Sequence, residues 1–127
     1  YDASETFETS ASTSKPRFTR FNERRKATKE MQICAASYSW LSNAAHMNTY
    51  LMRHAWKKYT APMLIIQAEW DDYVWTSQIQ KFADKIKKHG IAECEYLYLS
   101  ETKHETYSSN DETMDKYINK VFAFLQK

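Results

Sequence analysis

The sequence has 127 residues, of which 43% are hydrophobic and 15% aromatic, enough for a packed core, which excludes a disordered tail. With 18 Lys and Arg against 16 Asp and Glu, the formal net charge is only +2, so charge gives no reason to expect a nucleic acid partner. No apolar run approaches the roughly 20 residues that span a bilayer, and no signal peptide opens the chain. We expect a cytoplasmic protein without a transmembrane segment, with peripheral attachment to a membrane as the alternative.

The chain opens with a polar segment and a short basic helix. Residues 1–14 are rich in Ser, Thr and Glu, so we expect an extended connector rather than a packed element. Pro16 suits a first helical turn, and Phe18 and Phe21 share one face of the helix that follows. We interpret its arginines as a solvated face rather than as a membrane or nucleic-acid site.

A longer helical pattern covers residues 37–56 and forms a broad apolar stripe that another surface has to cover. The stripe includes Trp40, Leu41, Met47, Leu51, Met52 and Trp56. His46 and His54 could share a face of this helix, but no carboxylate or cysteine stands beside them. A metal site is therefore not expected there.

Two apolar runs predict buried strands. The first runs from Met63 to Ala68 and ends at an acidic loop, and the second runs from Cys94 to Leu99 and ends at a polar turn, residues 100–107. Strands joined by a helix form a parallel pair, and two parallel strands alone are too few for a sheet that is stable in water. We therefore expect an α/β protein that forms the edge of a larger sheet, completed by another polypeptide or by copies of this chain.

Two further helices belong to this second half. One begins at Thr76 or Ser77 and ends before Gly90, the only glycine in the sequence. For the last helix, Ser109 and Glu112 form a capping-box signature, followed by apolar residues at helical spacing.

Residues with catalytic potential follow both strands. The acidic loop holds Glu69, Asp71 and Asp72, and the polar turn holds His104, which no apolar periodicity explains as a core residue. In many hydrolases with a Ser-His-Asp triad, the acid precedes the histidine along the chain, and both follow the serine. The two candidates here stand in that order. Position alone leaves two aspartates open as the acid, and leaves His104 either functional or merely exposed.

Two segments carry a resemblance to a known family. TAPMLIIQAEWDDYV resembles the P-x-L-x-x-Q-x-x-x-D-x-x-V block of α/β-hydrolases of the lysophospholipase and monoacylglycerol lipase type, in which the catalytic aspartate corresponds to Asp71. SETKHETY resembles the turn after the last strand of that family, where the catalytic base corresponds to His104. SKPRFTRFNERR and ASYSWLSNAA resemble the helical cap of the bacterial lysophospholipases, although Ala35, Ala36 and Ser39 stand where glycines are usual.

The resemblance covers nearly the whole chain but only the C-terminal half of the family's domain. It implies a partial α/β-hydrolase, with a connector and helical cap segment in residues 1–58. Residues 59–127 would form the C-terminal part of the core, the last two strands of a parallel sheet with flanking helices. It further implies a serine hydrolase that cleaves carboxylic esters such as lysophospholipids or monoacylglycerols, with Asp71 and His104 as catalytic residues and no metal or organic cofactor.

The sequence departs from the family at the nucleophile. With one glycine it cannot contain the G-x-S-x-G elbow, nor the glycine-bearing loop that forms the oxyanion hole. We therefore expect an N-terminal half of the hydrolase as the partner that carries the serine, and no activity from this chain alone. The alternative is a non-catalytic half that binds itself or a partner through its open sheet edge.

The two cysteines give a third and less favoured hypothesis. Cys34 and Cys94 stand in apolar surroundings without C-x-x-C spacing, which is typical of reduced, buried thiols. An enzyme with Cys94 as nucleophile and His104 as base is disfavoured, because a thiol inside an apolar strand is inert.

Overall fold

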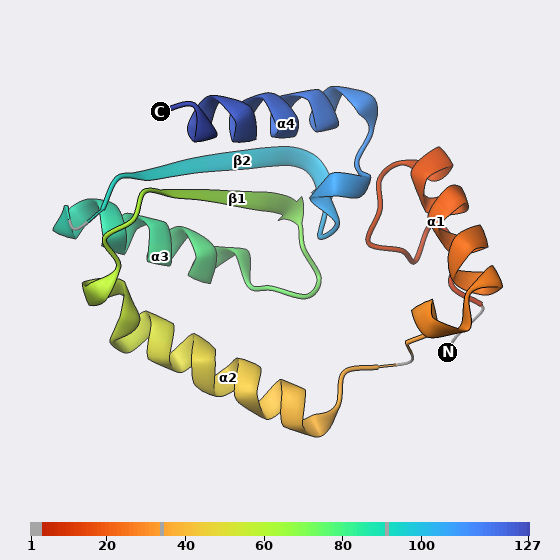
Figure 1. Cartoon of the computed structure of the whole chain (residues 1–127), viewed down its shortest axis with the longest axis horizontal. Helices are drawn as coiled ribbons and strands as arrows, with labels where there is room; N and C mark the ends of the chain where they lie inside the picture. The colour runs from red at the N-terminus through yellow and green to blue at the C-terminus, as the bar shows by residue number, and fades with distance from the viewer. Residues whose placement is uncertain (1–3, 34, 91) are drawn as a thin grey trace. The chain divides into compact units, whose positions relative to one another are not determined.

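The computed structural model describes residues 4–33, 35–90 and 92–127 (Figure 1). Its helices and strands, with 3₁₀ helices labelled η, are in chain order α1 (Lys15–Ala27), η1 (Lys29–Met31), α2 (Tyr38–Arg53), η2 (Ala55–Lys58), β1 (Met63–Trp70), α3 (Thr76–His89), β2 (Cys94–Lys103), η3 (Thr106–Ser108) and α4 (Asp111–Leu125). The predicted order of strand, helix, strand and helix in the second half of the chain is confirmed.

The two strands pair as a parallel two-stranded sheet, as predicted (Figure 1). Both are longer than predicted: β1 continues to Trp70, and β2 continues to Lys103, so the first residues of the predicted turn belong to the strand. At this end the Glu69 carboxylate accepts the backbone N–H of Glu101 at 2.7 Å. Glu101 has a φ of 52°, a left-handed conformation that is uncommon without glycine, and the side-chain hydrogen bond from the neighbouring strand holds it there.

The chain folds as two compact units. The first comprises the described parts of residues 1–34, 66–76 and 98–127, and the second comprises those of residues 35–65 and 77–97. The predicted division into a connector and cap segment and a core segment refers to the complete hydrolase domain and stays a prediction.

In the second unit, Trp56 of η2 is buried against α3. Its ring lies 4.4 Å from the ring of His89 and 4.8 Å from the ammonium of Lys85, measured to ring centroids. Lys85 also donates a hydrogen bond of 2.8 Å to the carbonyl of Met52. Helix α3 ends as predicted just before Gly90, whose φ of 58° suits a residue without a β-carbon.

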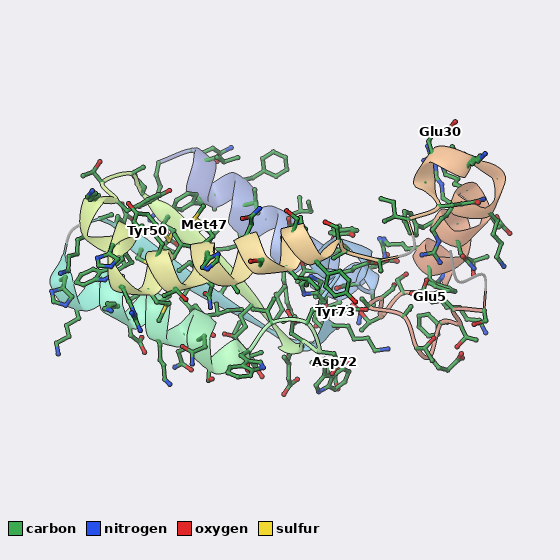
Figure 2. All side chains as sticks on the ribbon, turned by 90° about the horizontal axis from the view of Figure 1, so that it is seen from below. Glu5, Glu30, Met47, Tyr50, Asp72 and Tyr73 are labelled. Carbon is green, nitrogen blue, oxygen red and sulfur yellow. The ribbon has the colours of Figure 1, made fainter. Side chains whose placement is uncertain are left out.

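Helix α2 begins where its cap predicts but leaves its apolar side chains uncovered. The Ser37 hydroxyl accepts the N–H of Trp40 at 3.2 Å, a standard N-cap. The predicted helix over residues 37–56 ends earlier, at Arg53, and continues as η2. No residue of α2 is buried, and Met47 and Tyr50, labelled in Figure 2, are 57% and 45% exposed.

In the first unit, two local expectations were wrong. In its described part, residues 4–14, the N-terminal segment is not an extended connector, because Ser10, Ser12 and Ser14 are buried there. The cap of α4 is Asn110, whose side chain accepts the N–H of Thr113 at 2.9 Å; the predicted cap, one residue earlier, is itself fully buried. Composition and periodicity did not reveal the hydrogen bonds that fix either region.

Within the described ranges, none of the helices combines the length and apolar character needed to cross a bilayer. The location in the cell stays a prediction.

Candidate active site

Asp71 lies in the loop that follows β1, and its carboxylate is held by the backbone of the same loop. Its Oδ1 accepts the N–H groups of Tyr73 and Val74, each at 2.9 Å, the local pattern by which aspartate closes a turn on itself. The Asp71 side chain is only 6% exposed. The carboxylate is therefore fixed in position before any partner binds it.

His104 follows β2 directly and points its Nδ1 at that carboxylate. Nδ1 lies 2.9 Å from Oδ1 and 2.8 Å from Oδ2 of Asp71. A carboxylate can only accept, so Nδ1 carries the proton and donates it. The ring of Tyr73 lies 5.0 Å from the imidazole, at an interplanar angle of 51°, and restricts its rotation from one side.

This arrangement leaves the other ring nitrogen of His104 available for chemistry. The His104 side chain is 42% exposed, and in the tautomer with a protonated Nδ1 the lone pair is on Nε2. A histidine oriented by a buried carboxylate, with a free Nε2, has the geometry of a general base.

The surroundings of Asp71 keep its carboxylate ionised, as an acceptor of hydrogen bonds. Burial raises the pKa of Asp71, but the hydrogen bonds from His104 and from the amides of Tyr73 and Val74 outweigh it, so its pKa lies below the ordinary value of 3.8. At neutral pH the carboxylate is therefore ionised and accepts the Nδ1 proton of His104.

The structure separates the three acidic residues that follow β1 in the sequence, including the two aspartates that position left open. Asp71 is hydrogen-bonded to His104, Asp72 is exposed and is not bonded to it, and Glu69 caps the backbone of Glu101. Spacing alone could not choose between the aspartates; the resemblance chose Asp71, the residue that the structure brings to His104. The catalytic role of the pair stays a prediction.

Sequence reasoning missed two neighbours of this pair, Tyr73 and Lys103. Tyr73 contacts the imidazole, and an aromatic residue two positions after the acid was a signal that could have been noted. Lys103 binds the N-terminal segment through two carbonyls, a contact between residues more than 90 positions apart that no local pattern reveals.

The cysteine hypothesis gains no support. Cys94 is half-buried in β2, and burial raises the pKa of its thiol, the opposite of what an activated nucleophile needs. Cys34 lies outside the described residues. In the described part of the chain, no three His, Cys, Asp or Glu side chains gather closely enough to hold a metal ion.

Comparison with known proteins agrees with this geometry at the level of the family. A model described as the prolyl oligopeptidase family matches residues 6–127. The family has an α/β-hydrolase fold, and with it the predicted fold class, a partial α/β-hydrolase, is confirmed. The match does not extend to the narrower lysophospholipase and monoacylglycerol lipase type. No curated protein and no solved structure matches the chain.

Proposed function

We propose, because this chain belongs to the prolyl oligopeptidase family, that it supplies the acid and base of a serine hydrolase. The observation that carries this proposal is the pair itself: both oxygens of a buried Asp71 lie within 2.9 Å of Nδ1 of His104, whose ring remains 42% exposed. In an ordinary surface ion pair we would expect both side chains to be exposed, whereas here the acid is buried and the histidine is accessible.

The residues would act as follows. Nε2 of His104 takes the proton from a serine hydroxyl as the serine oxygen attacks the acyl carbonyl. Asp71 stabilises the resulting imidazolium, which then gives its proton to the leaving group. In the second half of the reaction, His104 takes a proton from the water molecule that attacks the acyl-enzyme. It then gives this proton to the serine oxygen as the acid product leaves. His104 thus ends the cycle neutral.

The serine and the oxyanion hole must come from elsewhere. A single glycine cannot provide a G-x-S-x-G elbow, so we propose a partner, the N-terminal half of the hydrolase. This chain alone should be inactive, because a base without nucleophile and oxyanion hole lacks the main contributions to rate.

For the substrate we propose carboxylic esters of lipids, such as lysophospholipids or monoacylglycerols. Support comes from the strand and acid block, in which Pro62, Leu64, Gln67, Asp71 and Val74 match the lysophospholipase pattern. Exposed apolar side chains on α2, namely Trp40, Leu41, Met47 and Leu51, offer a surface for an acyl chain. The name of the matched family favours a second candidate, a peptide bond, which the same base could serve.

The experiment uses the full-length protein and two substrate classes. We expect lysophosphatidylcholine and a monoacylglycerol to be cleaved with a kcat/KM at least about tenfold above that for a proline-containing peptide, and His104→Ala to abolish both reactions. A reversed preference would replace the lipid substrate by the peptide. Hydrolysis that survives His104→Ala would reject the proposed base, and complete inactivity would favour the non-catalytic binding module.

A further inference from the structure

Three features outside the pair bear on function: the apolar face of α2, the aromatic cluster around Trp56, and the contact of the N-terminal segment with the loop that carries His104. Only the last connects to the chemistry through a set of specific hydrogen bonds. We call residues 8–14 the strap and residues 103–108 the histidine loop. All of these residues belong to the first unit.

We propose that the strap positions His104, with Lys103 as the main positioning residue; this rests on the proposed function. Lys103 Nζ donates to the carbonyls of Glu8 at 3.0 Å and Ser10 at 2.8 Å. The N–H of Glu105 donates to the carbonyl of Ala11 at 3.0 Å. Both sequence neighbours of His104 are therefore bonded to the strap, while its imidazole is bonded to Asp71.

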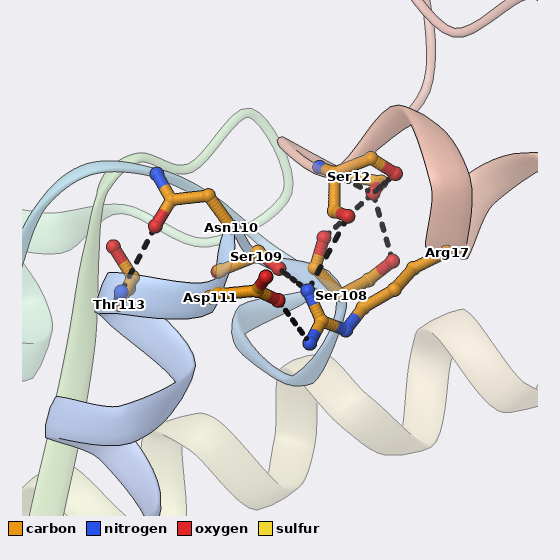
Figure 3. A network of polar contacts seen from close by, with 8 residues as sticks. Ser12, Arg17, Ser108, Ser109, Asn110, Asp111 and Thr113 are labelled. Carbon is orange, nitrogen blue, oxygen red and sulfur yellow. Dashed lines mark hydrogen bonds and ion pairs between the residues drawn. The ribbon is translucent and has the colours of Figure 1, made fainter.

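The far end of the strap is anchored to the same loop. The Ser12 hydroxyl lies 2.7 Å from both the carbonyl and the hydroxyl of Ser108, and the N–H of Ser14 donates to that carbonyl at 3.1 Å (Figure 3). Ser12 and Ser108 are 1% and 6% exposed. Beyond the strap, Arg17 donates to the carbonyl of Ser109 at 2.6 Å and pairs with Asp111 at 2.7 Å.

The histidine loop depends on these bonds because its buried side chains are polar. Ser108 is buried and is bonded to the strap through its carbonyl and hydroxyl, so this end of the loop is held by hydrogen bonds rather than by apolar packing. Loss of one partner would leave a buried donor or acceptor unsatisfied, and the loop would move to find water. The charged ammonium of Lys103 forms the stronger, charge-assisted type of bond.

The strap also forms a wall of the candidate site. A hollow of about 20 Å³ is lined by strap residues 9–11, by Tyr73 and Asp72, and by Lys103 and His104. That is room for about one water molecule beside the imidazole. Movement of the strap would therefore change both the position of His104 and its access to water.

The test is made on the full-length protein, by NMR of the His104 side chain. A hydrogen-bonded Nδ1 proton gives a separate downfield signal that exchanges slowly with water. We expect Lys103→Met to accelerate this exchange at least about tenfold, because losing the stabilisation of about one hydrogen bond lets the loop open more often. Lys103→Arg should restore most of the protection, and Lys116→Met, which removes an exposed pair on α4, should change nothing.

The outcomes separate the strap from the proposed function. If the wild-type protein gives the signal and Lys103→Met keeps its exchange rate, the strap inference is wrong while the pair stands. If the wild-type protein gives no such signal, or Asp71→Asn leaves it unchanged, the Asp71–His104 bond is absent in solution and the proposed function fails as well. Should Lys103→Met unfold, Ser12→Ala decides: faster exchange in a folded protein supports the strap, and unchanged exchange overturns it.

Discussion

At the scale of single residues, the main distinction is between two adjacent aspartates. Asp71 accepts hydrogen bonds from two backbone amides and from His104, whereas Asp72 is exposed. Consecutive residues of an extended loop direct their side chains differently, so only one of them can serve the imidazole. Identical chemistry at neighbouring positions makes each aspartate the matched control for the other.

We expect Asp71→Asn, in the full-length enzyme, to lower kcat by about three to four orders of magnitude, the effect of replacing a triad acid by its amide. Asp72→Asn should change kcat less than about tenfold, because it removes a solvated charge. Steady-state kinetics on the preferred ester measures both. If Asp72→Asn proves the more damaging change, the assignment of the acid is wrong.

The pKa of Asp71 predicts a pH dependence of stability. Its folded pKa lies below the ordinary value of 3.8, so its stabilising effect is complete above that value and is lost as the pH falls through the folded pKa. Calorimetry should show wild type more stable than Asp71→Asn at pH 7, with a difference in Tm that shrinks below about pH 4. A difference that stays constant or grows towards acid pH contradicts this.

At the scale of elements, periodicity predicted the helices and strands that local sequence determines. Helix α3 and its end at Gly90, the strand cores and α4 were all found, because apolar spacing and turn residues specify them. The ends of the strands and the folding of the N-terminal segment were not, because they depend on Glu69 and Lys103 bonding to backbone far away in sequence. The pair at the candidate site was predicted by position and resemblance. Neither of these predicted the hydrogen bonds from the N-terminal segment to the residues on either side of His104.

The corrected start of α4 can be tested with two neighbouring alanine substitutions. Asn110→Ala removes the N-cap acceptor of the Thr113 amide and should cost about 1 kcal/mol. Ser109→Ala removes a buried hydroxyl without a hydrogen-bond partner and should be neutral or slightly stabilising. Urea denaturation measures both free energies of unfolding. Greater destabilisation by Ser109→Ala would restore the capping box first predicted from the sequence.

At the scale of the whole molecule, the chain leaves apolar surface uncovered. Helix α2 has no buried residue, Trp40 is 61% exposed, and the sheet that the described residues form has two strands. Parallel sheets are normally covered on both faces and have several strands. We interpret these surfaces as those that an N-terminal half of the hydrolase would cover.

Without such a partner, the chain should associate with itself. Light scattering should give a mass that rises with concentration, and Met47→Glu on α2 should reduce this association, whereas its neighbour Asn48→Glu should not. A species that stays monomeric at all concentrations and unfolds cooperatively would show that the exposed surfaces need no cover.

We propose that this chain supplies the base for a nucleophilic serine outside its 127 residues, and fluorophosphonate labelling tests this most directly. In the full-length protein, mass spectrometry should locate the label on a serine outside these 127 residues, with labelling lost in His104→Ala. The chain alone should not be labelled. A label on any serine within this sequence, or labelling that does not depend on His104, would contradict the account.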